Sequence, residues 1–138
     1  MTFPERSAAV TIAALVVVFG AYFALLAAIG DARIGGVAYK PLLALAVVAL
    51  IIVMAGSHIV LALLSVKDAN AFDERDRMIS QRADQLGAVV LGVSVLSVIS
   101  LVIVEVEHVY IANALLLGLV VSQLTSESAR LWLYRRSA

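Results

Sequence analysis

Residues 67–84, KDANAFDERDRMISQRAD, separate two long apolar stretches and hold nine of the twenty charged residues of the chain. Over all 138 residues, 63% are hydrophobic and 14% are charged. Soluble domains have about half apolar and a quarter charged residues, so this composition excludes an ordinary soluble domain. We expect an integral membrane protein whose charged segment 67–84 lies at the aqueous boundary.

Four apolar runs are each near the length of about 20 residues that an α-helix needs to cross a bilayer. They cover residues 8–29, 41–66, 86–104 and 109–133. The first run is too long for the core of a signal peptide, so we expect it to be retained. The sequence therefore predicts an all-α fold, an integral membrane four-helix bundle in which residues 1–138 form one domain. Residues 105–108 leave room only for a tight turn.

Lysine and arginine are unevenly distributed between the ends of the predicted spans. The N-terminus, segment 67–84 and the C-terminus hold eight of the ten, the loop before Pro41 holds two, and residues 105–108 hold none. Positive residues near spans are retained on the cytoplasmic side. We expect both termini and the central segment to be cytoplasmic, and the chain to be a multi-pass protein of the cell inner membrane.

The central segment contains the start of a helix. Asp73 has a residue type that caps helix N-termini, and acidic residues in the next turn favour the positive end of the helix dipole. An apolar stripe continues from Ile79 past Arg82 into the third span. We expect one helix from Glu74 into the membrane, with a bend at Gly87 as one alternative.

Small residues recur within the spans, where they allow helices to approach closely. These are Gly20, Ala24, Ala88, Gly92, Ser94, Ser97 and Ser100. For the serines, two readings remain: a polar pathway, or packing with hydrogen bonds to the carbonyl one turn earlier. The same faces make a homo-oligomer, such as a dimer, a reasonable expectation.

A few polar residues lie inside the predicted spans. Each destabilises the protein there unless it has a hydrogen-bond or ion-pair partner. His58 lies on the second span, and Gln123, Glu127, Arg130 and Tyr134 follow the spacing of one face of the fourth span. We expect both sets in the same half of the membrane. A bond from His58 to Gln123 or Glu127 would be either a structural clamp or part of a proton relay.

The chain lacks the residues that most catalytic and cofactor-dependent reactions need. His58 and His108 are predicted in opposite halves of the membrane, so they cannot share a haem iron. Glu105, Glu107 and His108 form a weak metal candidate, since three donors on a short turn fall short of a defined ligand set. No hydrolase, metalloprotease, P-loop or dinucleotide motif occurs, and the net charge is zero. We expect no enzyme, no cofactor and no direct nucleic-acid binding.

Two short motifs resemble a family of small four-helix membrane proteins of bacteria and archaea. The family motif is close to DERxxxIxxKA, matched here by Asp73, Glu74, Arg75, Ile79, Arg82 and Ala83, with arginine at position 82 in place of the common lysine. A YRR at Tyr134, Arg135 and Arg136 is also similar to that family. The resemblance covers the topology of the whole chain. That family has no agreed function, but its members are often encoded beside a helix-turn-helix regulator. The resemblance therefore implies a membrane-tethered control role.

Two functions follow as expectations. The first is a regulatory or scaffold protein whose central segment docks a cytoplasmic partner, such as a transcriptional regulator, or forms an oligomer. Its partner-binding residues would be Asp73, Glu74, Arg75, Ile79 and Arg82. The alternative is a small transporter or proton-coupled sensor that uses His58 and Glu127. A helix cap with internally paired charges would explain the central segment without any partner.

Overall fold

The computed structural model describes residues 3–29, 39–67 and 74–136, and this part of the chain is helical apart from one turn. The helices are α1 (Phe3–Ile29), α3 (Tyr39–Lys67), α4 (Glu74–Ile103) and α5 (His108–Arg136). All four are long and apolar enough to cross a membrane. The prediction of an all-helical chain with four candidate spans is confirmed.

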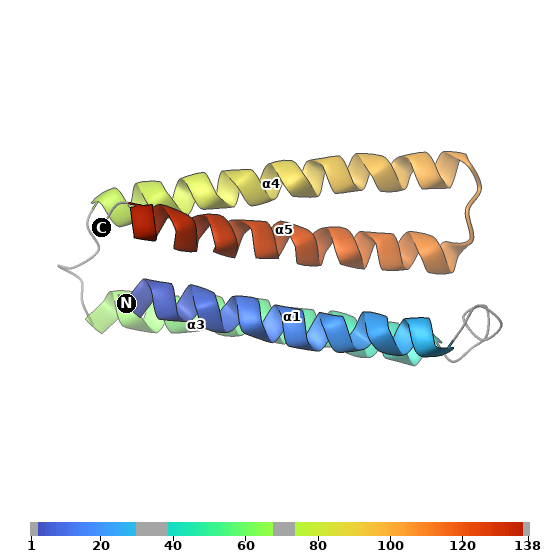
Figure 1. The fold of residues 1–138 in the computed structure, drawn as a ribbon, viewed down its shortest axis with the longest axis horizontal. Coiled ribbons are helices and arrows are strands. Elements are labelled where there is room, and N and C mark those ends of the chain that lie inside the picture. The colour runs from blue at the N-terminus through green and yellow to red at the C-terminus, as the bar shows by residue number, and fades with distance from the viewer. Residues whose placement is uncertain (1–2, 30–38, 68–73, 137–138) are drawn as a thin grey trace.

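The helices lie side by side as two pairs (Figure 1). Helices α4 and α5 form an antiparallel hairpin with the most extensive contact of the fold, and α1 packs on both α5 and α3. The first and last described residues, Phe3 and Arg136, lie at the same end of the bundle. We refer to this end as the terminal end.

The core lies between α1, α3 and α5. It consists of Leu15, Phe19, Tyr22, Ala46, Leu50, Leu116 and Val120. By contrast, α4 turns large apolar side chains outward, including Val93 and Leu96, which are 60% and 66% exposed. An apolar surface of this extent is favourable in contact with lipid, whereas in water it would promote aggregation. The exposure pattern therefore agrees with a membrane environment.

Helix α4 runs unbroken from Glu74 through Gly87 to Ile103, as the sequence predicted. Its 30 residues span about 45 Å at 1.5 Å per residue, against about 30 Å for a hydrocarbon core. The proposed cap at Asp73 lies outside the described residues. Pro41 falls in the first turn of α3, where its missing N–H leaves no helical hydrogen bond unmade.

The turn between α4 and α5 is as tight as expected and has a defined helix-ending geometry. Glu105 has a φ of 57°, in the left-handed region. The N–H of Val106 donates to the carbonyl oxygen of Leu101 at 3.2 Å, and that of Glu105 to Val102 at 3.1 Å. These two bonds form a Schellman motif, with glutamate at the position that glycine usually takes. Because α4 stops here, Glu105 lies in the turn, whereas His108 is the first residue of α5.

The positions of close helix approach agree only in part with those predicted, since Ser94 is in a close contact but Gly20 and Gly92 are not. A Cβ added at Gly20 would meet nothing within 4 Å among the described residues, and the same holds for Gly92. The close approach lies instead at Gly87, and at Gly118, where a Cβ would come within 2.7 Å of the Cβ of Ser94. The prediction was wrong at Gly20 and Gly92 because a small residue permits close packing but does not require it.

Candidate functional site

Close packing of α4 on α5 near the terminal end places the residues of the site. A Cβ at Gly87 would collide with the Ser126 hydroxyl and would lie 3.0 Å from the carbonyl oxygen of Ser122. The Ser122 hydroxyl donates a 2.8 Å hydrogen bond to the Gly87 carbonyl oxygen. This contact sets the register of the two helices. As a result, Asp84, one turn before Gly87, lies opposite Arg130, one turn after Ser126.

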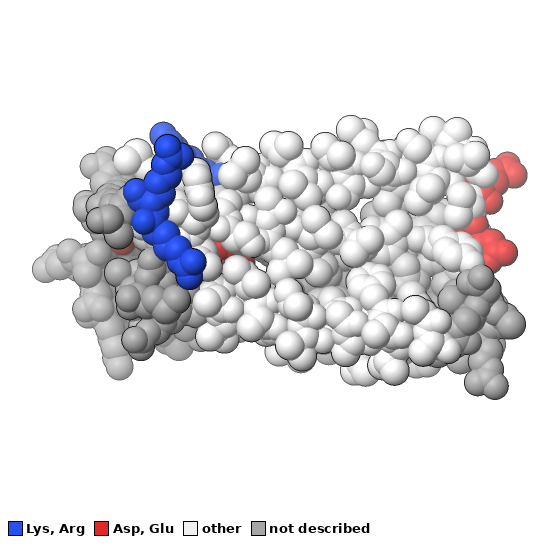
Figure 2. All heavy atoms as spheres, in the orientation of Figure 1, with Lys and Arg blue, Asp and Glu red and all other residues white. Residues whose placement is uncertain are grey.

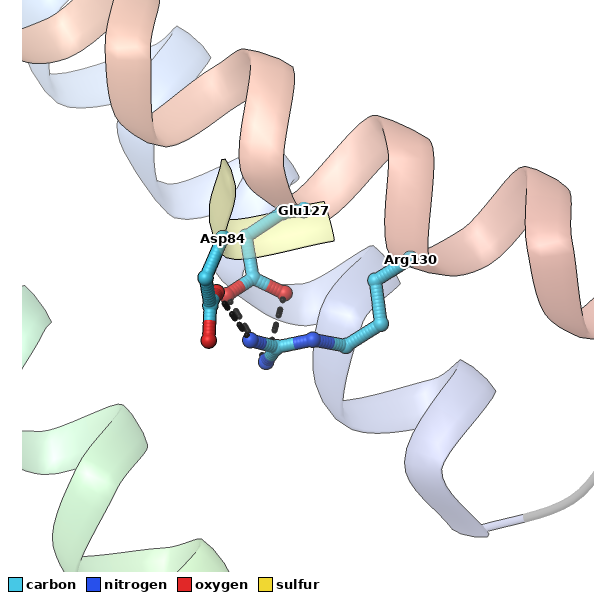
Figure 3. Close-up of polar contacts among 3 residues, drawn as sticks. All are labelled: Asp84, Glu127 and Arg130. Carbon is cyan, nitrogen blue, oxygen red and sulfur yellow. Dashed lines mark hydrogen bonds and ion pairs between the residues drawn. The ribbon is translucent and has the colours of Figure 1, made fainter. Parts of the chain in front are cut away.

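Three charged side chains meet at this point (Figure 3). Arg130 Nη2 donates to Asp84 Oδ1 at 2.9 Å, and Nη1 donates to Glu127 Oε1 at 3.2 Å. The side chains of Arg130 and Glu127 are each 10% exposed, and that of Asp84 is 60% exposed. The cluster is thus a buried ion pair extended by a third, more accessible carboxylate. Two carboxylates and one guanidinium give it a formal charge of −1.

The cluster lines a cavity of about 280 Å³ that all four described helices border. The polar wall comes from α4 and α5 and includes Asp84, Ser122, Gln123, Ser126, Glu127 and Arg130. The opposite wall comes mainly from α1 and α3 and includes Thr11, Leu15, Val53 and Met54. Buried charges beside an apolar wall are typical of ligand sites, where few polar groups orient a solute within a largely apolar pocket.

One donor in the cluster makes no hydrogen bond within the described part of the chain. The Nε of Arg130 is buried, and it has no hydrogen-bond acceptor among the described residues. Buried donors usually find a partner, because an unmade hydrogen bond to a desolvated group costs about 1–3 kcal/mol. The arginine that lines the cavity therefore retains one donor for an additional oxygen.

Three of the predicted intramembrane polar residues come together here. Gln123, Glu127 and Arg130 all line the cavity from α5, and Tyr134 lies one turn further, beside Arg130. His58 belongs to α3, four residues after the cavity residue Met54, but its side chain lies outside the described residues. Its bond to Gln123 or Glu127 stays a prediction.

The sequence allowed two roles for the serines of the third span, a polar pathway or hydrogen bonds within the helix. The structure shows hydrogen bonds within the helix. The hydroxyl groups of Ser94, Ser97 and Ser100 donate to carbonyl oxygens one turn earlier, at 2.8, 2.9 and 3.2 Å. Ser97 and Ser100 are exposed on the outer side of α4, away from the cavity. These hydrogen bonds satisfy polar groups within the helix and form no continuous polar path.

The outer residues Glu105, Glu107 and His108 lie at the α4–α5 turn, at the end opposite the terminal end, and are exposed. No group of three His, Asp or Glu side chains in the described part of the chain could hold a metal ion. His108 is instead the first residue of α5, and the carbonyl oxygen of Glu107 just before it accepts from the N–H of Tyr110 at 3.0 Å. The geometry gives these residues a role at the helix start.

The predicted partner-binding residues are only partly described. Asp73 and the side chains of Glu74 and Arg75 lie outside the described residues. Ile79 is 8% exposed and packs inside the bundle, whereas Arg82 is exposed. Of these five residues, only Arg82 is therefore seen with an accessible side chain.

Sequence reasoning missed two features of the site and its surroundings. It did not single out Asp84 as the partner of Arg130, although Asp84 is the last acidic residue before the apolar run of α4. It also missed a link between α1 and α5, in which the Tyr22 hydroxyl donates to Asn113 Oδ1 at 2.7 Å. A single asparagine amid apolar residues on α5 was the signal, because a polar group in a span needs a partner.

Fold and site together define a class: an all-helical chain with four helices long enough to cross a membrane and a charged cavity between them. Comparison with family models, curated proteins and solved structures finds no match for this chain. The resemblance carried by residues 73–83 and 134–136 therefore stays a prediction.

Proposed function

We propose that this chain is a multi-pass membrane protein that binds a small polar solute between its helix pairs, as a transporter or proton-coupled sensor. The observation that carries the proposal is the buried Glu127–Arg130 pair within a cavity bordered by all four helices. Ionisable residues within membrane spans have a high free-energy cost. They therefore face the protein interior and mark solute or proton pathways. A purely structural clamp between α4 and α5 would not require a cavity shared with α1 and α3.

We further propose that the terminal end faces the cytoplasm of a bacterial or archaeal cell, with the chain in the inner membrane. Figure 2 shows Lys and Arg side chains gathered near this end, with smaller patches of Asp and Glu beside them, and Asp and Glu side chains exposed at the opposite end. The exposed arginines there are Arg77, Arg82, Arg135 and Arg136. This distribution is the one expected from the positive-inside rule. The cavity would then open toward the cytoplasmic half, where Asp84 is accessible.

Proteoliposomes with an entrapped pH-sensitive dye test the function. After an imposed pH jump, we expect the wild-type chain to change the internal pH faster than empty liposomes do. Glu127→Gln should slow this response, because it removes the buried acidic group, whereas Glu107→Gln makes the same change at the exposed far end. The proposal fails if Glu127→Gln responds as fast as wild type, or if wild type does not differ from empty liposomes.

Docking of a cytoplasmic partner, or oligomerisation, is a second candidate. The supporting observation is the exposed basic surface that α4 and α5 share, with Arg77 and Arg82 on one helix and Arg135 and Arg136 on the other. Such charges give orientation and specificity to an interface with an acidic partner. Arg77→Ala with Arg82→Ala should reduce co-purification of cytoplasmic proteins or the mass of the detergent-solubilised oligomer. Unchanged values of both would remove this candidate.

A further inference from the structure

We propose that the cavity binds a small organic monocation: a protonated amine that carries an oxygen acceptor close to its charged group. This inference rests on the proposed function and names the class of its solute. It starts from the Asp84–Arg130–Glu127 cluster, from the open donor on Arg130 and from the apolar wall opposite. Each of these observations restricts the solute in a different way.

The arrangement of charges favours a cation over an anion. Both terminal nitrogens of Arg130 already donate to carboxylates, Nη2 to Asp84 and Nη1 to Glu127. An anion entering the cavity would have to displace one of these carboxylates and then lie beside both. A monocation instead offsets the formal charge of −1 and places its donors against carboxylate oxygens, the stronger class of hydrogen bond. In Figure 3, the contact drawn from Arg130 to Asp84 reaches only one of the two carboxylate oxygens.

The open donor requires an oxygen on the solute. Arg130 is 8% exposed and its Nε has no acceptor among the described residues, so bulk water reaches it poorly. A hydroxyl or carbonyl oxygen on the solute would accept this hydrogen bond while its ammonium group faces Glu127. A small molecule with both a donor and an acceptor would therefore match the carboxylates of the cluster and the Nε donor of Arg130. An alkylammonium ion without oxygen would satisfy only the carboxylates.

The opposite wall and the volume favour an organic ion over a metal ion. Leu15 of α1 and Val53 of α3 have hydrocarbon side chains on the opposite wall, and Leu91 of α4 adds a third hydrocarbon side chain to the lining. Hard metal ions such as Ca²⁺ take six to eight oxygen ligands, which such a wall cannot supply. A volume of about 280 Å³ exceeds what a bare ion fills and leaves room for a short carbon chain against these side chains.

Isothermal titration calorimetry on the full-length chain in detergent micelles tests this proposal, at constant pH and ionic strength. The probes are ethanolammonium, propylammonium, ethylene glycol and glycolate, which separate the charge from the oxygen acceptor. We expect saturable binding of ethanolammonium, weaker binding of propylammonium, and the weakest for ethylene glycol and glycolate. Tighter binding of glycolate or ethylene glycol than of ethanolammonium would overturn the ammonium assignment.

Variants locate the binding. Glu127→Gln should lower the affinity for ethanolammonium by a factor of about thirty or more, as expected for loss of a buried charged partner. Asp84→Asn keeps the buried Glu127–Arg130 pair. It should lower the affinity for ethanolammonium only about two- to fivefold, since the Asp84 carboxylate is accessible. Val53→Phe fills the cavity from α3 without changing a charge and should abolish binding, whereas Glu107→Gln should leave it unchanged. Wild-type affinity in both Glu127→Gln and Val53→Phe would overturn the site.

The two proposals fail separately. If ethanolammonium gives no heat of binding while the pH response of proteoliposomes still depends on Glu127, the solute class is wrong and the proposed function stands. If ethanolammonium binds with the expected dependence on Val53 but the pH response is indifferent to Glu127, the proton-coupled function fails and the binding site stands.

Discussion

Replacing Arg130 with methionine tests whether the buried cluster stabilises α4 against α5. The substitution keeps the unbranched stem of the side chain, so the packing near the helix is retained while the guanidinium and its positive charge are lost. Buried Glu127 then loses its 3.2 Å contact with the guanidinium, and Asp84 loses a 2.9 Å contact. We expect a substantial loss of stability, most of it from Glu127.

The burial of the two carboxylates sets the expected size of this loss. Glu127 has a side chain that is 10% exposed, and removing one partner of such a pair costs about 3–5 kcal/mol. Asp84 is 60% exposed, and pairs of that accessibility contribute about 1 kcal/mol or less. We therefore expect Arg130→Met to lower the free energy of unfolding by about 3–5 kcal/mol. Glu127→Gln should cost less, because Arg130 keeps Asp84.

The measurement is reversible unfolding in mixed detergent micelles by added dodecyl sulfate, followed by circular dichroism. A double variant, Glu127→Gln with Arg130→Met, should be more stable than the sum of the single effects predicts, by at least about 1 kcal/mol. Arg135→Met is the matched control, since Arg135 is exposed on the same helix, and its effect should stay within about 0.5 kcal/mol. Strictly additive effects, or a cost below about 1 kcal/mol for Arg130→Met, would refute the reasoning.

Four further substitutions can be followed by the same unfolding measurement. Gly118→Ala should destabilise by about 1–3 kcal/mol, because its Cβ would come within 2.7 Å of a serine Cβ on α4, a clash that no rotamer relieves. Gly92→Ala meets open space and should stabilise by about 0.5–1 kcal/mol, so equal effects at the two glycines would contradict this packing. Glu105→Gly should stabilise by about 1 kcal/mol, since glycine adopts the φ of 57° without strain, and a loss would show that the glutamate side chain itself matters. Tyr22→Phe removes the 2.7 Å hydrogen bond to Asn113 and should cost about 0.5–1.5 kcal/mol, whereas no change would show the bond to be dispensable.

Part of the site could have been predicted from the sequence through the register of the α4–α5 hairpin. The turn centres on Val106, and in two antiparallel helices of equal rise, residues equally far from the turn lie opposite each other. Ser94 and Gly118 are each twelve residues from Val106 and are in contact. Asp84 and Arg130, at 22 and 24 residues, follow the same rule. A turn this short leaves little freedom for another register.

The position of α1 and α3 against this hairpin could not be predicted. Both helices are apolar on nearly all sides, so no stripe marks the inward face. In water, burial selects that face, but lipid is as apolar as the protein interior and gives no such preference. The link from Tyr22 to Asn113, and the positions of Val53 and Met54 on the cavity, therefore depend on packing between helices far apart in the chain.

The sequence by itself determined the number of candidate spans in the described chain, the unbroken start of α4 at Glu74 and the presence of a tight turn between the last two spans. These follow from local composition, because a helix satisfies its own backbone hydrogen bonds and its length must match the bilayer. Only the tertiary structure decided that Asp84, Glu127 and Arg130 meet beside a cavity that α1 and α3 complete. Side-chain shape and hydrogen bonding select the helix contacts in lipid, and neither is visible along a single apolar helix.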